Sequence, residues 1–361
     1  MIHRVKTKLQ VSAASMKLKA LVKTAILEAS SLWTASGLYK NSAMHGVIFT
    51  LHHVRPSQAG SNPQQKNLEI TPDFLDLVIS TLRDLGYRFI RLEELEAETK
   101  DRSRQPFAVF TLDDGYRDNV TYALPVFARY QVPFTIFACS GFIQRTHSMW
   151  WETAFELVQQ QQSLQFDFGD GREQVSLASP DAREAAYQRL SRFIMNSDEA
   201  KAIDKLNQAA SDCGIDPMKP VDETILDEAE LIALSRHPLA TIGAHSVSHR
   251  AMARLTHEEL TEELTSSRLY LETLLSQEIC TFAFPYGHRA EAGPREFAAA
   301  GASGFKLAVT TVQAPVCNED VTSALQLPRV NIDGRWQRRR YVAALAFGLP
   351  SRVLGTFANS R

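Results

Sequence analysis

Apolar positions along the chain follow two alternating patterns. Unbroken apolar runs are typical of strands buried on both faces, and segments with apolar residues three or four apart are typical of helices. The runs lie at residues 47–51, 107–112, 134–138 and 239–244, and the helical segments lie at 71–85 and 120–130. Strands that alternate with helices predict an α/β fold with a parallel sheet.

The alternation stops between about residues 144 and 233. This stretch is long, polar and helix-prone, and it contains the glutamine run at 159–162. A break of this kind within an alternating pattern indicates an insertion, so we expect a helical subdomain at about 144–233.

The composition favours one large domain. With 361 residues and a hydrophobic content of 44%, the chain can bury a sizeable core. Lysine and arginine total 39 against 41 for aspartate and glutamate, a net charge of −2, which argues against nucleic-acid binding through overall charge. The four cysteines form no Cys-x-x-Cys, which argues against a zinc ribbon or a disulfide framework and favours reduced thiols in the cytoplasm.

Two short motifs carry candidate chemistry. Asp113 and Asp114 follow the apolar run at 107–112 and precede a glycine, and His245 and His249 follow the run at 239–244. Consecutive side chains that leave a strand point in different directions, so one carboxylate can bind a metal while the other faces water. The histidine spacing brings both rings to one side of a helical turn. Each motif alone is weak, but together they predict a hydrolytic zinc site at the C-terminal ends of two strands.

A third motif, Phe-Ala-Phe-Pro-Tyr-Gly at 282–287, follows the other two in the chain. In this order the three motifs resemble those of the NodB-homology polysaccharide deacetylases, carbohydrate esterase family 4, over about residues 46–334. The resemblance implies a distorted (β/α)7-type barrel. We therefore expect a catalytic domain at 46–334 that carries the helical insertion and has helical extensions at 1–45 and 335–361.

The resemblance also implies roles for individual residues. Asp114, His245 and His249 would be the metal ligands, Asp113 the general base, and the backbone N–H of Tyr286 the donor to the oxyanion. Zinc is the default ion, although Co²⁺, Ni²⁺, Mn²⁺ and Fe²⁺ also suit two histidines and one carboxylate.

One departure from the family pattern concerns the base. The arginine that usually precedes the Pro-Tyr pair and orients the base is Ala283 in this chain. Arg329, which follows Leu-Pro, is our candidate for the missing group, and Arg117 is a weaker one. The alternative for Arg329 is an ordinary ion pair with a surface carboxylate.

A second departure concerns the general acid. The usual Leu-x-His near the end of the domain is absent, because no histidine follows His288. The strand at 47–51 ends in His52 and His53, and one branch of the family has a histidine at the end of its first strand. Imidazole suits proton donation near neutral pH, so we expect His52 to be the acid, with His53 second.

The expected function is metal-dependent deacetylation of an N-acetylated glycan of the GlcNAc type. Pro285, Trp150 and Trp151 are the expected substrate contacts, since a flat aromatic face suits a sugar ring; the two tryptophans could instead pack against their own insertion. Three alternatives remain: an O-acetyl esterase, an enzyme that hydrolyses a small non-sugar amide, and a glycan-binding protein that has lost catalysis.

Both ends of the chain are basic and amphipathic. The first 44 residues carry seven lysines and arginines against only Glu28, and three consecutive arginines begin at Arg338. Neither a secretory signal nor a run of roughly 18 apolar residues is present. We expect the N-terminal helix either to pack over the closed end of the barrel or to contact an anionic membrane, so the protein is expected to be cytoplasmic or peripheral on the inner membrane.

Overall fold

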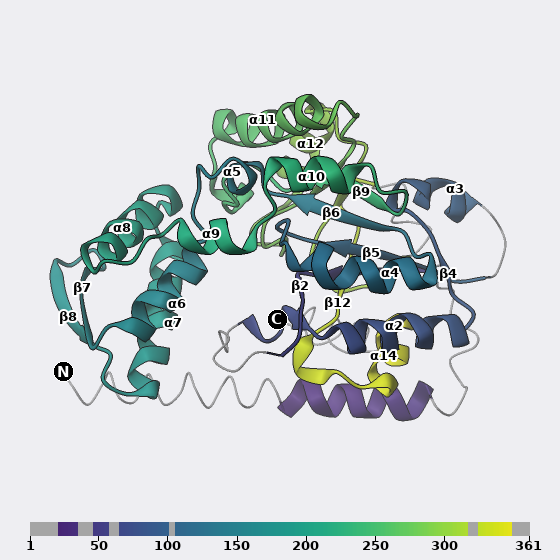
Figure 1. The fold of residues 1–361 in the computed structure, drawn as a ribbon, viewed down its shortest axis with the longest axis horizontal. Helices are drawn as coiled ribbons and strands as arrows, with labels where there is room; N and C mark the ends of the chain where they lie inside the picture. The colour runs from purple at the N-terminus through teal and green to yellow at the C-terminus, as the bar shows by residue number, and fades with distance from the viewer. Residues whose placement is uncertain (1–20, 35–45, 58–64, 101–104, 317–323, 349–361) are drawn as a thin grey trace.

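The centre of the molecule is a curled sheet of parallel strands (Figure 1). The computed structural model describes residues 21–34, 46–57, 65–100, 105–316 and 324–348. The strand order is β11–β10–β9–β6–β5–β1–β12, and β4 pairs with β5 beside this path. The strands are β1 (Gly46–Leu51), β4 (Arg88–Phe89), β5 (Phe107–Leu112), β6 (Phe134–Ala138), β9 (Ala240–Ala244), β10 (Thr281–Ala283), β11 (Leu307–Val309) and β12 (Val330–Asn331). The four apolar runs predicted as strands are therefore confirmed as β1, β5, β6 and β9.

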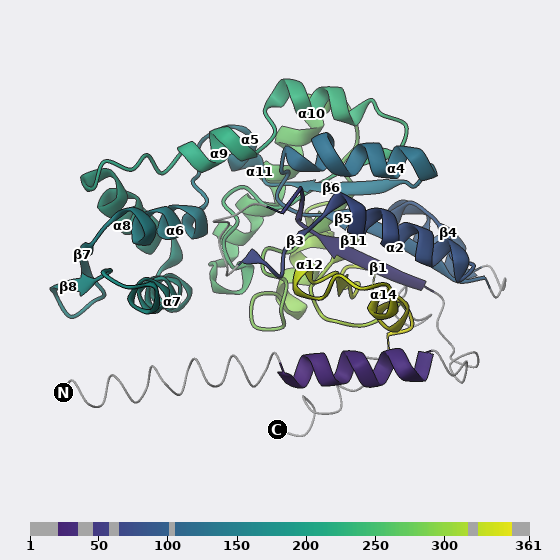
Figure 2. The ribbon, with the colours of Figure 1, turned by 60° about the horizontal axis from the view of Figure 1, so that its bottom comes forward.

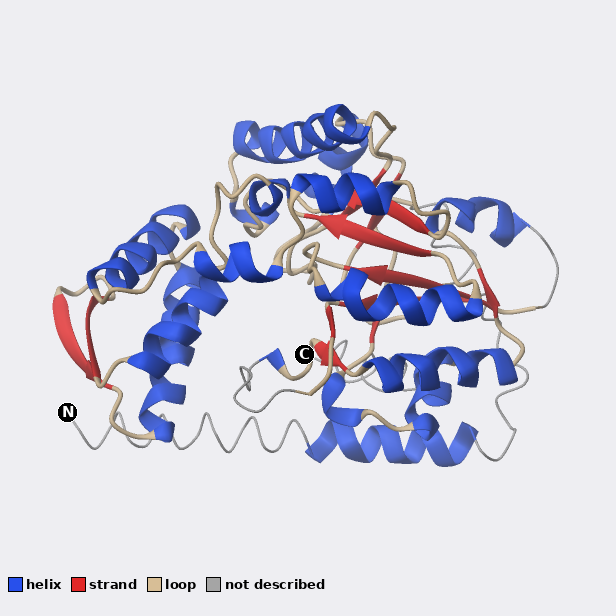
Figure 3. Ribbon diagram, viewed as in Figure 1, coloured by secondary structure: helices blue, strands red, loops and turns tan. Residues whose placement is uncertain are grey.

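Helices cover the outer face of this sheet (Figure 3). Their bounds are α2 (Pro72–Asp84), α3 (Leu95–Lys100), α4 (Leu124–Tyr130), α5 (Ser140–Ile143), α10 (Glu228–Ser235), α11 (His257–Leu275), α12 (Pro294–Ala302) and α14 (Arg339–Ala346). Short turns of helix lie at η2 (Leu92–Glu94), η4 (Met252–Arg254) and η5 (Gly334–Trp336), and a π-helix η3 (Asn119–Ala123) leads into α4. The Thr71 side chain accepts a hydrogen bond from the N–H of Phe74 and so caps α2, as the predicted helix start requires.

The sheet curls into a half-barrel because the segment before β12 reaches both ends of the strand order. Val309 at the end of β11 bridges Leu327, and three residues later Val330 pairs with Phe49 of β1. Alternate residues of the strands form a separate interior cluster, while the others pack under the helices. The predicted barrel-like α/β fold is confirmed in this curled form. Arg329, just before β12, is fully buried.

The insertion projects beyond the C-terminal ends of the strands and is drawn in teal (Figure 1). It consists of α6 (Trp150–Gln160), α7 (Pro180–Asn196), α8 (Glu199–Asp212) and α9 (Lys219–Thr224), together with an antiparallel hairpin of β7 (Ser163–Asp167) and β8 (Arg172–Ser176). The sequence pattern predicted only helices here. A second small pair, β2 (His53–Val54) and β3 (Glu69–Ile70), lies next to the end of β1.

A helix over residues 21–34 packs beside η5 and α14 (Figure 2). The Lys23 ammonium lies 2.9 Å from the Asp333 carboxylate, and the Trp336 indole N–H donates to the Thr24 hydroxyl at 2.9 Å. The remaining parts of the predicted extensions, 1–20, 35–45 and 349–361, lie outside the described residues. Among the residues that are described, no helix is long and apolar enough to cross a membrane.

Candidate active site

The two aspartates lie directly after β5, at the C-terminal rim of the sheet. Both are buried, and the backbone turns sharply at Asp114 (φ 72°) and Gly115 (φ 81°). A left-handed backbone at a residue with a side chain costs about 1–3 kcal/mol and is held only where the surroundings enforce it. The turn sends neighbouring carboxylates to different partners. Asp113 faces the barrel interior and Asp114 faces the histidines.

The two histidines follow β9, but the predicted helical turn between them is wrong. Residues 245–250 form an irregular loop with positive φ at Ser246 (63°) and His249 (56°). The Ser246 hydroxyl accepts the N–H of His249 at 3.0 Å, which closes this loop. A spacing of four residues therefore brings the rings together through a tight loop instead of through a helix.

Asp114, His245 and His249 form one compact donor group. The Asp114 Oδ1 atom lies 3.4 Å from His245 Nε2 and 3.3 Å from His249 Nε2, and the three ligand atoms lie within 4.8 Å of one another. The Nδ1 atom of His245 is 2.7 Å from the carbonyl of Ala283, which leaves Nε2 free to act as a ligand. Burial raises the pKa of Asp114, but the hydrogen bonds of the two imidazoles outweigh it and hold this pKa well below its usual range.

Glu263 of α11 holds the histidine loop in place. Its buried carboxylate accepts the N–H groups of Val247 and Ser248 at 2.8 and 2.9 Å, and also the Ser248 hydroxyl. Sequence reasoning missed this residue. Its signal was a glutamate on the otherwise buried stripe of α11, between Leu260 and Leu264.

Arg329 forms a bidentate ion pair with Asp113. Its two terminal nitrogens donate to the two carboxylate oxygens at 2.7 Å each, while Nε donates to the carbonyl of Thr310. Burial raises the pKa of Asp113, but the charge and hydrogen bonds of Arg329 outweigh burial and lower it. Arg117 lies elsewhere, because its guanidinium pairs with Glu230. Of the two candidates, the structure thus brings only Arg329 to the base.

Tyr286 lies across from the histidines and is held by the insertion. Its hydroxyl donates to Glu199 of α8 and accepts from the Trp150 indole of α6, both at 2.9 Å. The backbone at Tyr286 is left-handed (φ 58°), and its carbonyl accepts from the Thr311 hydroxyl at 2.6 Å. No acceptor for the Tyr286 N–H occurs among the described residues. Glu199 also accepts the N–H of Ala251, so it joins both sides of the site; no sequence motif indicated it.

The adjacent histidines have different surroundings. His52 lies beside Asp113, with 4.0 Å between Nε2 and the carboxylate, and burial lowers its pKa against the opposing charge of Asp113. His53 is buried away from the base: its Nδ1 atom is 2.6 Å from Asp118, and its ring packs on Tyr116 at 3.7 Å between centroids. Of the two, only His52 reaches the site.

A cavity of about 370 Å³ connects these groups. The cavity is lined by the two aspartates and by His52, His245 and His249. Trp150, Trp151, Tyr286 and further polar residues such as Gln65 and Asn331 complete the lining. The tryptophans are buried, and Trp151 packs on the His249 ring at 4.9 Å between centroids. Pro285 is buried too and is not part of this lining.

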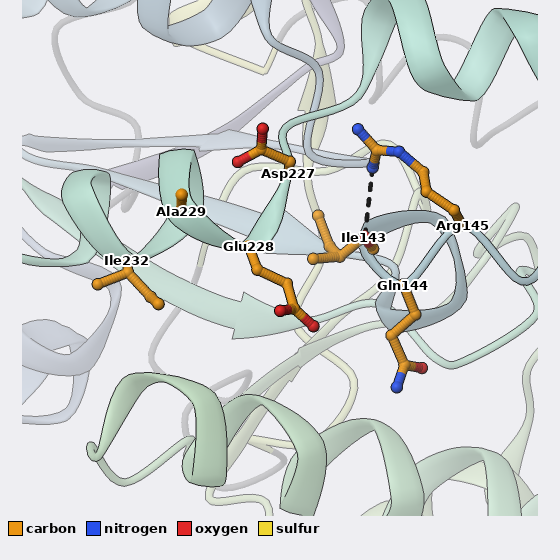
Figure 4. Close-up of a pocket in the computed structure, with 7 residues that line it drawn as sticks. All are labelled: Ile143, Gln144, Arg145, Asp227, Glu228, Ala229 and Ile232. Atoms are coloured by element: carbon orange, nitrogen blue, oxygen red, sulfur yellow. Dashed lines mark hydrogen bonds between the residues drawn. The ribbon is translucent and has the colours of Figure 1, made fainter.

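A second hollow lies at the base of the insertion and contains none of these groups (Figure 4). Arg145 dominates it. Its guanidinium donates to the carbonyls of Ile143, Ile225 and Leu226, so it ties the chain entering the insertion to the chain leaving it. Because the Arg145 donors bind backbone carbonyls, we assign this hollow a structural role.

The sequence profile of the polysaccharide deacetylases matches residues 100–169 and 200–304, and the unmatched stretch between them contains β8 and α7 of the insertion. The chain belongs to the polysaccharide deacetylase family. Membership makes it a hydrolase that removes acetyl groups from a polysaccharide, with cleavage of a carbon–nitrogen bond.

Solved structures of deacetylases share the fold. The deacetylase PplD of Streptococcus pyogenes superposes with a TM-score of 0.53 at 16% identity, covering 81% of this chain and 94% of that one. A polysaccharide deacetylase from Bacillus cereus gives 0.53 at 14% identity, covering 83% and 68%. A de-N-acetylase from Aggregatibacter actinomycetemcomitans gives 0.51 at 13% identity, covering 81% and 96%. No curated protein sequence matches the chain. At these low sequence identities, the superpositions support only the fold of this polysaccharide deacetylase.

Proposed function

We propose that this polysaccharide deacetylase hydrolyses the acetamide of an N-acetylated sugar, of the GlcNAc type, within an oligo- or polysaccharide. One observation carries the proposal. A carboxylate held by a buried arginine, Asp113, lies next to a metal-type donor group, and both open into one cavity. A water molecule in that cavity would meet a base and a Lewis acid at once.

The donor group fits a divalent ion. Asp114 Oδ1 is buried and lies 3.4 and 3.3 Å from the Nε2 atoms of His245 and His249, so one ion could reach all three atoms. Two imidazoles and one carboxylate match the ligands of catalytic zinc sites, so zinc is our first choice. A divalent ion held by these residues would supply a lowered pKa for water and polarisation of the acetyl carbonyl.

Asp113 and His52 would handle the protons. Arg329 keeps Asp113 ionised and fixes both of its oxygens, so the carboxylate is ready to accept a proton from the attacking water. A protonated His52, on the same side of the cavity, would then donate to the nitrogen of the departing amine. Its low pKa makes the imidazolium a strong acid.

Tyr286 would stabilise the charge that develops on the acetyl oxygen. Its backbone N–H has no acceptor among the described residues, and a rigid donor of this kind is typically worth about 3–4 kcal/mol in the transition state. The ring is fixed by Glu199 and Trp150, so the peptide is preorganised. Trp150 and Trp151 line the same cavity and are the proposed contacts to the sugar.

Acetate release tests the proposal. Zinc-loaded protein is incubated with N-acetylchitooligosaccharides and, in parallel, with O-acetylated xylan. We expect release from the chitooligosaccharides that falls at least about hundredfold in Asp113→Asn and in His52→Ala. Arg117→Met, which removes a partly exposed pair with Glu230 and two hydrogen bonds to backbone carbonyls away from the cavity, is the control and should retain activity.

Three outcomes would change the proposal. Release from xylan alone would assign the protein as an O-acetyl esterase. Full activity after chelation, with no loss in Asp114→Asn, would remove the metal from the mechanism. Binding of chitooligosaccharide without any acetate release would favour a glycan-binding protein.

A further inference from the structure

The helix over residues 21–34 turns a largely polar face toward the protein and an apolar face outward, the reverse of the usual arrangement of an amphipathic surface helix. Its side facing the protein carries Ser30, Ser31 and Thr34, all buried, with Leu27 as the one large apolar side chain among its buried residues. The buried hydroxyls are satisfied within the helix: Ser31 donates to the carbonyl of Glu28, and Thr34 donates to that of Ser30. This inner face therefore needs no apolar packing beyond Leu27.

The opposite side of the same helix is apolar throughout. Leu21 and Leu32 are 68% and 72% exposed, and Val22 and Trp33 are 47% and 51% exposed. The exposed alanines at 25 and 29 complete this outer face, because all six positions fall on one side at 100° per residue. Among the described residues of the whole chain, these four account for most of the large apolar side chains that are exposed.

The outer face is bordered by positive charge. The neighbouring segment from η5 to α14 carries four arginines and no acidic residue, and three of them, Arg338, Arg339 and Arg340, have side chains about half exposed. The helix and this segment together hold five cations against the three acidic partners Glu28, Asp84 and Asp333. In sequence, residues 1–20 add five more lysines and arginines and no acidic residue.

From this arrangement we infer that the outer face of helix 21–34 docks on an anionic lipid bilayer. An exposed apolar stripe inserts at the depth of the acyl chains, and arginines beside it meet the lipid phosphates. A second copy of this chain is the less suitable occupant, because two cationic faces would repel each other. The helix lies at the edge of the molecule beside α14 (Figures 1 and 2).

Vesicle sedimentation with the full chain tests the inference. The vesicles are phosphatidylcholine alone, or equal parts phosphatidylcholine and phosphatidylglycerol. We expect binding to the anionic vesicles that weakens with salt. Leu32→Glu should weaken binding roughly ten- to hundredfold, and Arg338→Gln about fivefold. Leu269→Glu is the matched control, since Leu269 is 49% exposed on α11 and should be neutral.

Several results would overturn docking. These are an absence of binding to the anionic vesicles, equal binding to both vesicle types at all salt concentrations, or equal losses in Leu32→Glu and Leu269→Glu. A dimer in sedimentation velocity that Leu32→Glu converts to monomer would assign the face to a second copy. Acetate release from soluble chitooligosaccharides should be unchanged in Leu32→Glu, which separates this inference from the proposed catalytic function.

Discussion

Replacement of Arg329 by methionine should destabilise the protein strongly and in a pH-dependent way. Arg329 is fully buried and Asp113 is nearly so, and two hydrogen bonds of 2.7 Å join them. Methionine fills most of the space that the aliphatic part of the arginine side chain occupies, but it leaves a buried carboxylate without a counter-charge. Breaking a buried pair in this way costs about 3–5 kcal/mol.

The pH dependence follows from the pKa of Asp113. Arg329 holds this pKa below its ordinary value of 3.8, so the pair contributes stability above that pH, and the contribution is lost as the pH falls through the folded-state pKa. In Arg329→Met, only the weaker influence of His245 and His52 opposes burial, so the folded-state pKa should rise above the unfolded one. The variant therefore loses stability as the pH rises. The difference between the two proteins should be largest near neutral pH and should shrink as the pH falls through the lowered folded-state pKa of Asp113.

Denaturant unfolding at several pH values measures this difference, and the pH profile of acetate release gives a second readout. The acidic limb of the profile should move to higher pH in Arg329→Met, because the base is protonated until a higher pH. Arg329→Lys restores the charge but not the bidentate geometry, so it should fall between the two. Arg117→Met, which breaks a partly exposed pair and two hydrogen bonds to backbone carbonyls, should cost less than Arg329→Met.

The reasoning would be refuted by a loss of stability that is equal at every pH, since that result describes lost packing rather than an uncompensated charge. It would also be refuted by an unchanged acidic limb together with a change of less than about 1 kcal/mol at neutral pH.

Three further predictions concern neighbouring groups. His52→Ala should lower kcat about 10²–10⁴-fold and abolish the alkaline limb of the pH profile, which burial shifts below the ordinary imidazole range in the parent protein. Glu263→Gln should weaken zinc binding about 10–100-fold in a chelator competition, whereas Glu259→Gln, which alters the exposed cap of the same helix and its pair with Arg250, should weaken it far less. Glu199→Ala and Tyr286→Phe should each lower kcat more than they raise KM, and their losses should be less than additive in the double variant, because both changes break the hydrogen bond that the two residues share.

The strands, and the site residues that directly follow them, could be predicted because both depend on local sequence pattern. A parallel strand covered on both faces must be apolar along its whole length, so β1, β5, β6 and β9 are visible as runs. The polar residues that directly follow such runs must lie on one rim of the sheet. This is why Asp114 and His245 meet in the fold although 131 residues separate them in the chain.

The histidine loop and its supports could not be predicted in the same way. A spacing of four residues is compatible with a helical turn, and what selects the irregular loop is Glu263, which takes two backbone N–H groups from a different element. Glu199 reaches Tyr286 from 87 residues away and lies in the insertion, where no motif marks it. Contacts of this kind depend on how elements pack, which hydrophobic periodicity does not encode.

The alanine at 283 and the arginine at 329 are explained by the same geometry. Ala283 is fully buried in the interior cluster, and its carbonyl receives the Nδ1 atom of His245. Both oxygens of Asp113 are already occupied by Arg329. An arginine at position 283 would bring a second guanidinium to a carboxylate whose two oxygens each already accept from Arg329, at several kcal/mol of desolvation. The two positions are therefore alternative sources of one ion pair, and the departure at 283 does not deprive the base of its partner.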